Sequence, residues 1–158
     1  MKQIDRTEAE RIVSTYADTL LRLCFTYLGS VQDAEDIVQT VYLKLLVSGP
    51  EFQSPEHEKA WLIRTAVNAC KDELRAFRRR AVPLEAIPEK TALEIPSSPV
   101  LDSVMALPNK YRGVIYLFYY EGYSIREIAG LLGRSETAVA AQLSRGRGKL
   151  RKMLGGQK

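Results

Sequence analysis

The sequence has 158 residues, 46% of them hydrophobic, and a formal net charge of +4. This length allows one or two small domains, and the apolar fraction is too high for a disordered chain. No apolar run is long enough to span a membrane, and the N-terminus lacks the charged-then-apolar pattern of a secretory signal, so we expect no membrane insertion.

The cysteines and the single histidine give little support for a catalytic or metal-binding site. Cys24 and Cys70 both fall in apolar helical patterns, which favours buried thiols over a disulfide and is typical of a reducing cytoplasm. His57 is the only histidine, so metal-ligand spacing and a Cys–His catalytic pair are both poorly supported. No phosphate-cradling glycine loop or nucleophile motif is present. We predict a cytoplasmic protein that is not an enzyme and needs no metal or cofactor.

The charges fall into blocks along the chain. Residues 1–60 have a net charge of −4 and residues 81–108 a net charge of −3. Between and after them, residues 61–80 have a net charge of +4 and residues 109–158 a net charge of +7. Two basic blocks divided by an acidic stretch indicate two polyanion-binding surfaces. Solvated helix faces are the alternative.

The first eighty residues predict three helices, because apolar residues recur there at helical spacing. The predicted starts are a capping box, a capped acidic turn and a Ser-Pro pair: Thr7 with Glu10, Ser30 with Asp33, and Ser54 with Pro55. The predicted ends are Gly29, the pair Gly49 and Pro50, and Arg80. In the third helix, the residues available to the core are Trp61, Leu62, Ala66, Cys70, Leu74 and Phe77.

Residues 81–98 change in character and predict a linker, since they are rich in proline and poor in large apolar residues. Pro99 then opens a short helix, which Pro108 breaks while starting the next one. That helix closes at Gly122 and contains VIYLFYY, residues 114–120. Strand is the alternative for this run because β-branched and aromatic residues favour it. We predict helix because capped helical segments flank it.

The last predicted helices form a helix-turn-helix. Ser124 with Glu127 makes a capping box, and Ser135 caps the second helix. Ala129 is small where the helices cross, Gly133 supplies a left-handed turn, and Val139 packs back on the first helix. The predicted core face of the second helix consists of Val139, Leu143, Gly146, Leu150 and Leu154.

The other side of that helix combines short and cationic side chains, as a helix in the DNA major groove requires. Ala138 and Ala141 would lie against thymine methyls, and Gln142 would pair with adenine. The residues suited to phosphates are Arg145, Arg147 and Lys149. Gly146 would permit close packing, whereas Gly148 has no physical explanation at this level. An ordinary helical hairpin with a basic surface is the alternative.

Three segments in this order resemble the RNA polymerase sigma factors of the extracytoplasmic-function (ECF) type. They are DAEDIVQTVYLKLL at 33–46, WLIRTAVNACKDELRAFRRR at 61–80, and the helix-turn-helix. The resemblance implies an all-α fold of two helical domains joined by a Pro-containing linker. Residues 1–80 would bind polymerase and melt the minus-ten element, 81–98 would be the linker, and 99–158 would read the minus-thirty-five element.

The resemblance also implies a role for particular residues. The polymerase-binding set would be Asp33, Asp36, Gln39, Tyr42 and Lys44. The minus-ten set would be Arg64, Asn68, Asp72, Arg75, Arg78 and Arg79. The minus-thirty-five set would be Ser124, Ser135, Thr137, Ala138, Ala141, Gln142, Arg145, Arg147 and Lys149. The implied partners are core RNA polymerase, promoter DNA and an anti-sigma factor.

Two further features bear on this resemblance, a loop before the third helix and two residues of the last one. The loop GPEFQSPEHE, residues 49–58, is the candidate wall of a pocket for an unstacked base, where Phe52 or His57 would touch the base. An ordinary helix-entry loop is the alternative, and Trp61 is expected in the core rather than stacked on a base. Ala140 and Gln142 stand where many family members carry Lys and Arg, which predicts weaker electrostatic binding by this domain.

Three other classes of protein remain as alternatives. The first is a helix-turn-helix repressor or activator that acts without core polymerase and uses residues 1–80 to dimerise or to sense a signal. The second is an enzyme with an appended DNA-binding end, such as a recombinase, although Ser14, Ser48 and Tyr42 lack the setting of a nucleophile. The third is an interaction protein that mimics a sigma factor.

Overall fold

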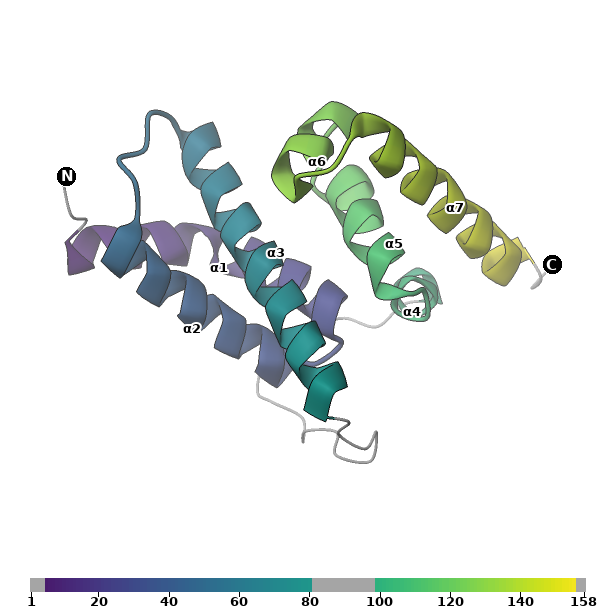
Figure 1. Cartoon of the computed structure of the whole chain (residues 1–158), viewed down its shortest axis with the longest axis horizontal. Coiled ribbons are helices and arrows are strands. Elements are labelled where there is room, and N and C mark those ends of the chain that lie inside the picture. Colours follow the sequence, from purple (N-terminus) through teal and green to yellow (C-terminus); the bar gives the residue numbers. More distant parts are fainter. Residues whose placement is uncertain (1–4, 81–98, 156–158) are drawn as a thin grey trace. The chain divides into compact units, whose positions relative to one another are not determined.

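The computed structural model describes residues 5–80 and 99–155, and their side chains at 5–77 and 102–155. All regular structure in these ranges is helical, and the chain divides into two compact units, Met1–Leu93 and Glu94–Lys158 (Figure 1). The prediction of an all-α fold with two helical regions is therefore confirmed. The proposed linker, residues 81–98, lies outside the described residues.

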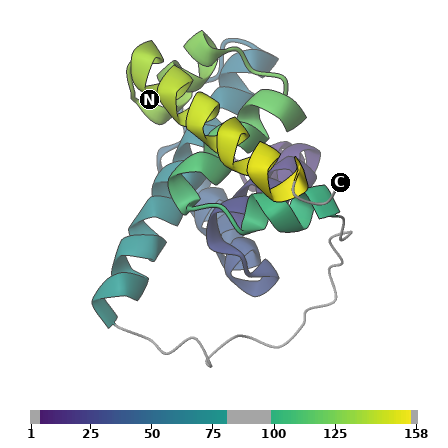
Figure 2. The ribbon, with the colours of Figure 1, turned by 90° about the vertical axis from the view of Figure 1, so that its right-hand side faces the viewer.

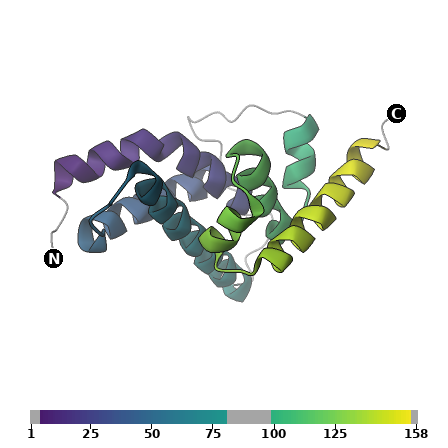
Figure 3. The same cartoon turned by 90° about the horizontal axis from the view of Figure 1, so that it is seen from above.

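The first unit contains three long helices: α1 (Arg6–Leu28), α2 (Val31–Ser48) and α3 (Pro55–Arg80). α2 runs back along α1, and α3 packs against both (Figures 1 and 3). Large side chains from all three helices are excluded from water, among them Leu20, Leu23, Val41, Leu45, Leu62 and Ile63. This shared core fixes which faces of α2 and α3 remain exposed.

Most of the predicted helix ends in the first unit are confirmed. Gly29 ends α1 in the left-handed conformation with φ of 72°, which glycine adopts without strain. The Ser30 hydroxyl accepts a hydrogen bond from the backbone N–H of Asp33. The Ser54 hydroxyl likewise accepts one from the N–H of His57, so Pro55 starts α3 as expected.

The capping box predicted at Thr7 is wrong, because Asp5 caps α1 instead. Its carboxylate oxygen Oδ1 accepts a hydrogen bond of 2.8 Å from the N–H of Glu8. Glu10, the expected partner of Thr7, lies 3.7 Å from Arg6 in an exposed ion pair. An ionised carboxylate at the N-cap satisfies a helix N–H and also interacts favourably with the helix dipole, which favours the earlier start.

Phe77 was expected in the core, and this expectation is also wrong. Its side chain is 39% exposed, and the fully buried apolar residues of α3 end at Cys70. The 26 residues of α3 extend further than the 18 residues of α2, so the last turns of α3 have less apolar surface to cover them. Leu74 and Trp61 are half-buried.

The second unit contains α4 (Pro99–Met105), α5 (Asn109–Ile115), the π-helix η1 (Tyr116–Tyr120), α6 (Ile125–Leu132) and α7 (Glu136–Gly155). α7 packs against α4, α5 and α6, and its crossing over α5 is visible in Figure 2. The core of this unit includes Val114, Leu117, Ile128, Val139 and Leu143.

The run VIYLFYY is helical as predicted, but it widens into the π-helix η1, which the sequence pattern did not indicate. The N–H of Glu121 reaches back five residues to the Tyr116 carbonyl, at 3.2 Å. A wide turn changes the direction of the side chains that follow it. Tyr119 and Tyr120, which end this apolar run, are 56% and 62% exposed.

None of the helices within residues 5–80 and 99–155 combines the length and the apolar character that a membrane span requires.

Candidate protein and nucleic-acid interfaces

The exposed face of α2 carries both acidic and apolar side chains. Asp36 and Gln39 are exposed at positions that share one side of the helix with Leu43 and Val47. Leu43 is 57% exposed and Val47 is 77% exposed. Large apolar groups that face water beside charged ones are typical of a protein-binding surface. We call these four residues the α2 stripe.

Leu43 and Val47 were not among the residues predicted from the sequence, and some of the predicted residues lie elsewhere on α2. Tyr42 is half-buried and lies on the flank between the stripe and the core face. Lys44 is exposed but turns away from Gln39. Of the predicted set, the structure brings the exposed Asp36 and Gln39 together on the stripe, and the half-buried Asp33 lies one turn before Asp36.

The exposed face of α3 carries four residues of the predicted minus-ten set in one row. They are Arg64, Asn68, Asp72 and Arg75, all exposed and spaced at three or four residues. Arg75 donates a hydrogen bond from Nη2 to the Asp72 carboxylate. Asp72 thus orients a cation within the row. Arg78 and Arg79 continue the helix, and their side chains lie outside the described residues.

Three aromatic rings order the loop before α3. The Phe52 ring meets His57 and Trp61 edge-on, at centroid distances of 5.3 Å and 5.9 Å. His57 Nδ1 accepts a hydrogen bond of 3.2 Å from the backbone N–H of Gln53. His57 therefore helps to hold the loop, and both Phe52 and His57 are half-buried.

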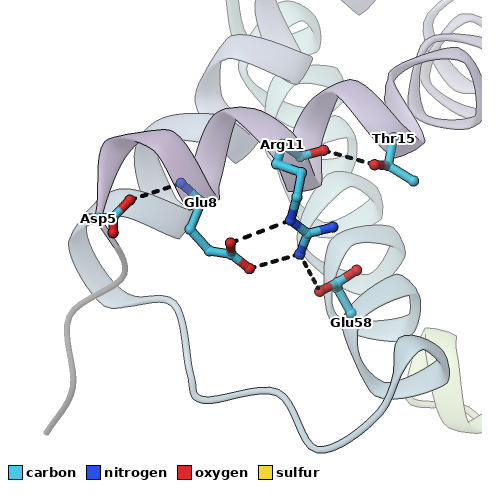
Figure 4. Close-up of polar contacts among 5 residues, drawn as sticks. All are labelled: Asp5, Glu8, Arg11, Thr15 and Glu58. Atoms are coloured by element: carbon cyan, nitrogen blue, oxygen red, sulfur yellow. Dashed lines mark hydrogen bonds and ion pairs between the residues drawn. The ribbon is translucent and has the colours of Figure 1, made fainter.

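An ionic cluster joins the beginnings of α1 and α3 (Figure 4). Arg11 donates to Glu8 at 2.7 Å, and its Nη2 lies 3.6 Å from a carboxylate oxygen of Glu58, whose side chain is only 14% exposed. The hydrogen bond that Arg11 donates to the Glu8 carboxylate is the main reason that the pKa of Arg11 is raised. Burial, and then the charge of Glu58, raises the pKa of Tyr16 beside this cluster. The contacts help to place the start of α3.

The helix-turn-helix forms as predicted (Figures 2 and 3). Ser124 and Glu127 make a reciprocal capping box on α6, with both hydrogen bonds present. Gly133 takes a left-handed conformation with φ of 66°, and the Ser135 hydroxyl caps α7 by accepting from the N–H of Ala138. Ala129 and Val139 are buried where the two helices cross. This turn places α7 with one face on the core and the other toward solvent.

The outward face of α7 holds part of the predicted minus-thirty-five set. Ala138, Ala141 and Gln142 are half-buried, and Arg145 and Lys149 are exposed further along the same side. Thr137 is exposed at the edge of this face, and the exposed hydroxyls of Ser124 and Ser135 serve as helix caps. Short side chains followed by cations are what an interface with duplex DNA requires.

Arg147 and Arg134 each donate a hydrogen bond to a neutral side chain. Arg147 points away from the row of Arg145 and Lys149, and its Nη1 donates to the Tyr119 hydroxyl at 3.2 Å. Arg134 donates from Nη1 to Gln142 Oε1 at 2.5 Å. Arg134 was not predicted from the sequence, because a residue between two helices carries no periodic signal.

The two glycines inside α7 differ in their surroundings. A Cβ at Gly146 would lie 2.7 Å from Ile115 Cδ1 and 3.3 Å from Tyr111 Cβ, so α5 and α7 approach closely there. The predicted packing role of Gly146 is therefore confirmed. A Cβ at Gly148 would meet nothing within 4 Å, and packing offers no explanation for that glycine.

Neither cysteine is placed for chemistry. Both thiols are free and buried. The hydrogen bond with Cys24 and burial raise the pKa of Cys70 well above its ordinary range, which keeps its thiol protonated. Within the described parts of the chain, no three His, Cys, Asp or Glu side chains are grouped to hold a metal ion.

The two units match two family models in order. The model of Sigma-70 region 2 matches residues 12–80, which cover nearly all of α1 to α3. The model of Sigma-70, region 4 matches residues 98–150, from α4 into α7. Together they account for both helical units.

Proteins similar to this chain are also named as sigma factors. The ECF RNA polymerase sigma factor SigW of Bacillus subtilis is 29% identical over 173 residues, covering 98% of this chain and 92% of the relative. The RNA polymerase sigma factor CarQ of Myxococcus xanthus is 32% identical over 132 residues, covering 77% of this chain and 75% of the relative. The sigma factor RpoE of Bartonella quintana, solved with the anti-sigma factor NepR, shares the fold with a TM-score of 0.72 at 19% identity, covering 97% and 98% of the two chains.

A helix-turn-helix match alone would suit many regulators, but a region 2 match ahead of it does not favour a repressor or activator that works without polymerase. Sigma factors are initiation factors and not enzymes, which also answers the recombinase alternative. The chain belongs to the RNA polymerase sigma factors of the ECF type, and it is a transcription initiation factor that binds core RNA polymerase and directs it to promoters.

Proposed function

We propose a division of labour between the two units. The first unit, through α2 and α3, binds core polymerase and opens the minus-ten element, and the second unit anchors on the minus-thirty-five element through α7. The observation that carries this proposal is the presence of separate exposed faces of different chemistry: the α2 stripe, the polar row of α3 and the outward face of α7.

The α2 stripe is the proposed contact with core polymerase. Burying Leu43 and Val47 in an interface would remove two large apolar side chains from water, worth roughly 1.5–3 kcal/mol each when burial is complete. Asp36 and Gln39 lie at the same face, where charge complementarity would set register and association rate.

Charge reversal at Asp36 tests this contact, with Asp18 as its matched control. Asp36→Lys and Asp18→Lys make the same change of charge at exposed positions of one unit, but Asp18 lies on α1, outside the stripe. We expect Asp36→Lys to weaken binding to purified core polymerase at least tenfold and Asp18→Lys to change it little. Equal effects of the two variants would remove the α2 stripe from the interface. Asp33 is a poorer test because reversal in the first turn also opposes the helix dipole.

The row on α3 and the loop before it are the proposed minus-ten surface. Extruding a base from duplex DNA costs a few kcal/mol, which cations along the strand and a shaped pocket must offset. Arg64 and Arg75 supply cations on one face, and Asn68 supplies a side chain that both donates and accepts hydrogen bonds. Phe52, supported by His57 and Trp61, supplies the wall of the pocket.

Phe52→Ala separates promoter opening from polymerase binding. We expect permanganate reactivity of minus-ten thymines to fall about tenfold, since one aromatic–base contact is worth about 1–3 kcal/mol. Affinity for core polymerase should stay unchanged. Normal permanganate reactivity in the variant would show that the loop is an ordinary entry to α3.

We further propose an anti-sigma factor as a partner and the cytoplasm as the place of action. The support is the family itself, which acts on DNA and polymerase, and the relative solved with the anti-sigma factor NepR. An anti-sigma factor should compete with core polymerase for the chain in a binding assay. Simultaneous binding of both without loss of transcription would argue against such a role.

A further inference from the structure

The side chain of Arg134 lies on the outward side of the helix-turn-helix, next to residues already assigned to DNA. Arg134 directly follows the left-handed Gly133, and its backbone N–H donates to the Ala129 carbonyl at 3.0 Å. Its guanidinium reaches Gln142, eight residues further along the chain. Ala138 and Gln142 share one side of α7, four residues apart. The arginine side chain therefore reaches the side of α7 that carries Ala138 and Gln142.

The hydrogen bond settles which atoms Gln142 presents. A glutamine amide has a carbonyl oxygen that accepts and an NH₂ group that donates. Since Arg134 carries only donors, it must bond to the oxygen, as the contact of Nη1 with Oε1 shows. The NH₂ group takes no part in this bond, while the oxygen keeps one of its two lone pairs for another donor. Pairing with adenine needs both the oxygen and the NH₂, so the bond with Arg134 competes with it, whereas a guanine acceptor needs only the NH₂.

We propose that Arg134 and Gln142 act as one unit in reading the minus-thirty-five element. The unit presents mainly hydrogen-bond donors, from the guanidinium and from the amide NH₂. In the major groove guanine presents two acceptors, N7 and O6, whereas adenine presents one acceptor and one donor and cytosine a donor. The unit therefore selects guanine at one position of the element. This inference rests on the proposed function of α7 as the reader of duplex DNA.

Selection from a promoter library tests the proposal with the holoenzyme. Core polymerase and the full chain would transcribe templates with a randomised minus-thirty-five element, and the transcribed templates would be sequenced. We expect guanine to be enriched at one position by the wild-type chain. Arg134→Ala should lower that preference about tenfold, as expected for loss of a bidentate contact, and leave the other positions unchanged.

Further variants distinguish recognition of a base from electrostatic attraction to the DNA phosphates. Gln142→Ala should weaken the same preference, and the double variant should be little worse than Arg134→Ala, because residues in one contact are not additive. Arg134→Lys keeps the charge without the planar fork and should retain yield but not the preference. Arg151→Ala, the matched control, removes one exposed cation near the end of α7 and should leave every base preference intact.

Each contrary result has a distinct meaning. A uniform loss of yield in Arg134→Ala, as in Arg151→Ala, would make Arg134 a phosphate contact and overturn the proposal. Enrichment of adenine that depends on Gln142 but not on Arg134 would also overturn it. If the wild-type holoenzyme showed no preference anywhere in the element, the proposed function of α7 would fail as well. Circular dichroism of Arg134→Ala checks that the turn, which its backbone hydrogen bond holds, still folds.

Discussion

The arginines of the two helical units have different kinds of partner. In α1 to α3, Arg11, Arg22 and Arg75 each pair with a carboxylate three or four residues away on the same helix. In the second unit, Arg134 and Arg147 bond to an amide and to a phenol, which are neutral. A carboxylate cancels the charge of an arginine at long range, whereas a neutral partner orients it and leaves the charge to attract a polyanion. The ion pairs of the first unit thus offset part of its cationic charge, whereas the charges of Arg134 and Arg147 are not offset by these neutral partners.

The largest expected effects come from truncating the core of each unit. Leu62→Ala in the first unit and Leu143→Ala in the second each remove a side chain with 0% exposure. Each should lower the free energy of unfolding of its own unit by about 2–5 kcal/mol through lost burial and a cavity.

The only tryptophan, Trp61, reports on the first unit alone. In urea titrations, tryptophan fluorescence should detect Leu62→Ala and miss Leu143→Ala, while far-ultraviolet circular dichroism should detect both. If Leu143→Ala shifted the fluorescence transition as much as Leu62→Ala does, the two units would unfold together. Their stabilities would then not be independent.

The glycines of α7 give a smaller effect of opposite sign. Gly148→Ala should stabilise the second unit by about 1 kcal/mol, since its Cβ has room and alanine favours helix. Gly146→Ala gains the same propensity, but the Cβ meets Ile115 and Tyr111, and overpacking costs about 1–3 kcal/mol. We expect a net loss of about 1 kcal/mol in the dichroism-monitored titration. If Gly146→Ala were stabilising like Gly148→Ala, α5 would be able to shift away from α7 at little cost.

Replacing one arginine of each unit with alanine tests whether the partners of an arginine decide its contribution to DNA binding. Arg145→Ala should lower promoter affinity across sequences and flatten its dependence on log salt by about one unit of slope. Arg11→Ala removes the same charge from the cluster with Glu8 and Glu58 and should leave that slope unchanged. Fluorescence anisotropy of holoenzyme on a labelled promoter measures both. If both variants gave the same dependence of promoter affinity on log salt, the position of an arginine would not determine its contribution to DNA binding.

The smallest effect is a pH dependence confined to the unit that contains the cysteines. The raised pKa of Cys70 means that the folded state favours the protonated thiol. Its contribution to stability is complete below the unfolded-state pKa of about 8.5 and is lost as pH rises above it. The fluorescence-detected urea midpoint should therefore fall between about pH 8 and 10, and less so in Cys70→Ala. An equally steep fall in Cys70→Ala would assign the effect to another group, such as Tyr16, whose pKa is also raised.

Local signals were the most reliable part of the sequence. Gly29, Ser54 with Pro55, and the Ser124 capping box lie where predicted, because each works through hydrogen bonds within a few residues. Where two local signals competed, at Asp5 and Thr7, the choice between them was wrong. The π-helix at Tyr116 was also missed, since α-helix and π-helix share the same composition and differ only in how the turn packs.

The candidate surfaces were predicted only in part for a related reason. The resemblance implied the row on α3, and helical spacing identified the outward face of α7, where short side chains are followed by cations at intervals of three or four residues. It assigned Leu43 and Val47 no role in binding, since an apolar residue on a helix is usually buried and only the packed neighbours show which ones are exposed.

By itself, the sequence determined that this chain is helical, where most helices begin and end, and which segments resemble a sigma factor, because those properties depend on residues close together in the chain. Only the tertiary structure decided that Gly146 is a contact point of α5 with α7, that the α2 stripe faces water, and that Arg134 holds Gln142. Each of these depends on residues far apart in sequence or on what covers a helix face, and no local pattern encodes it.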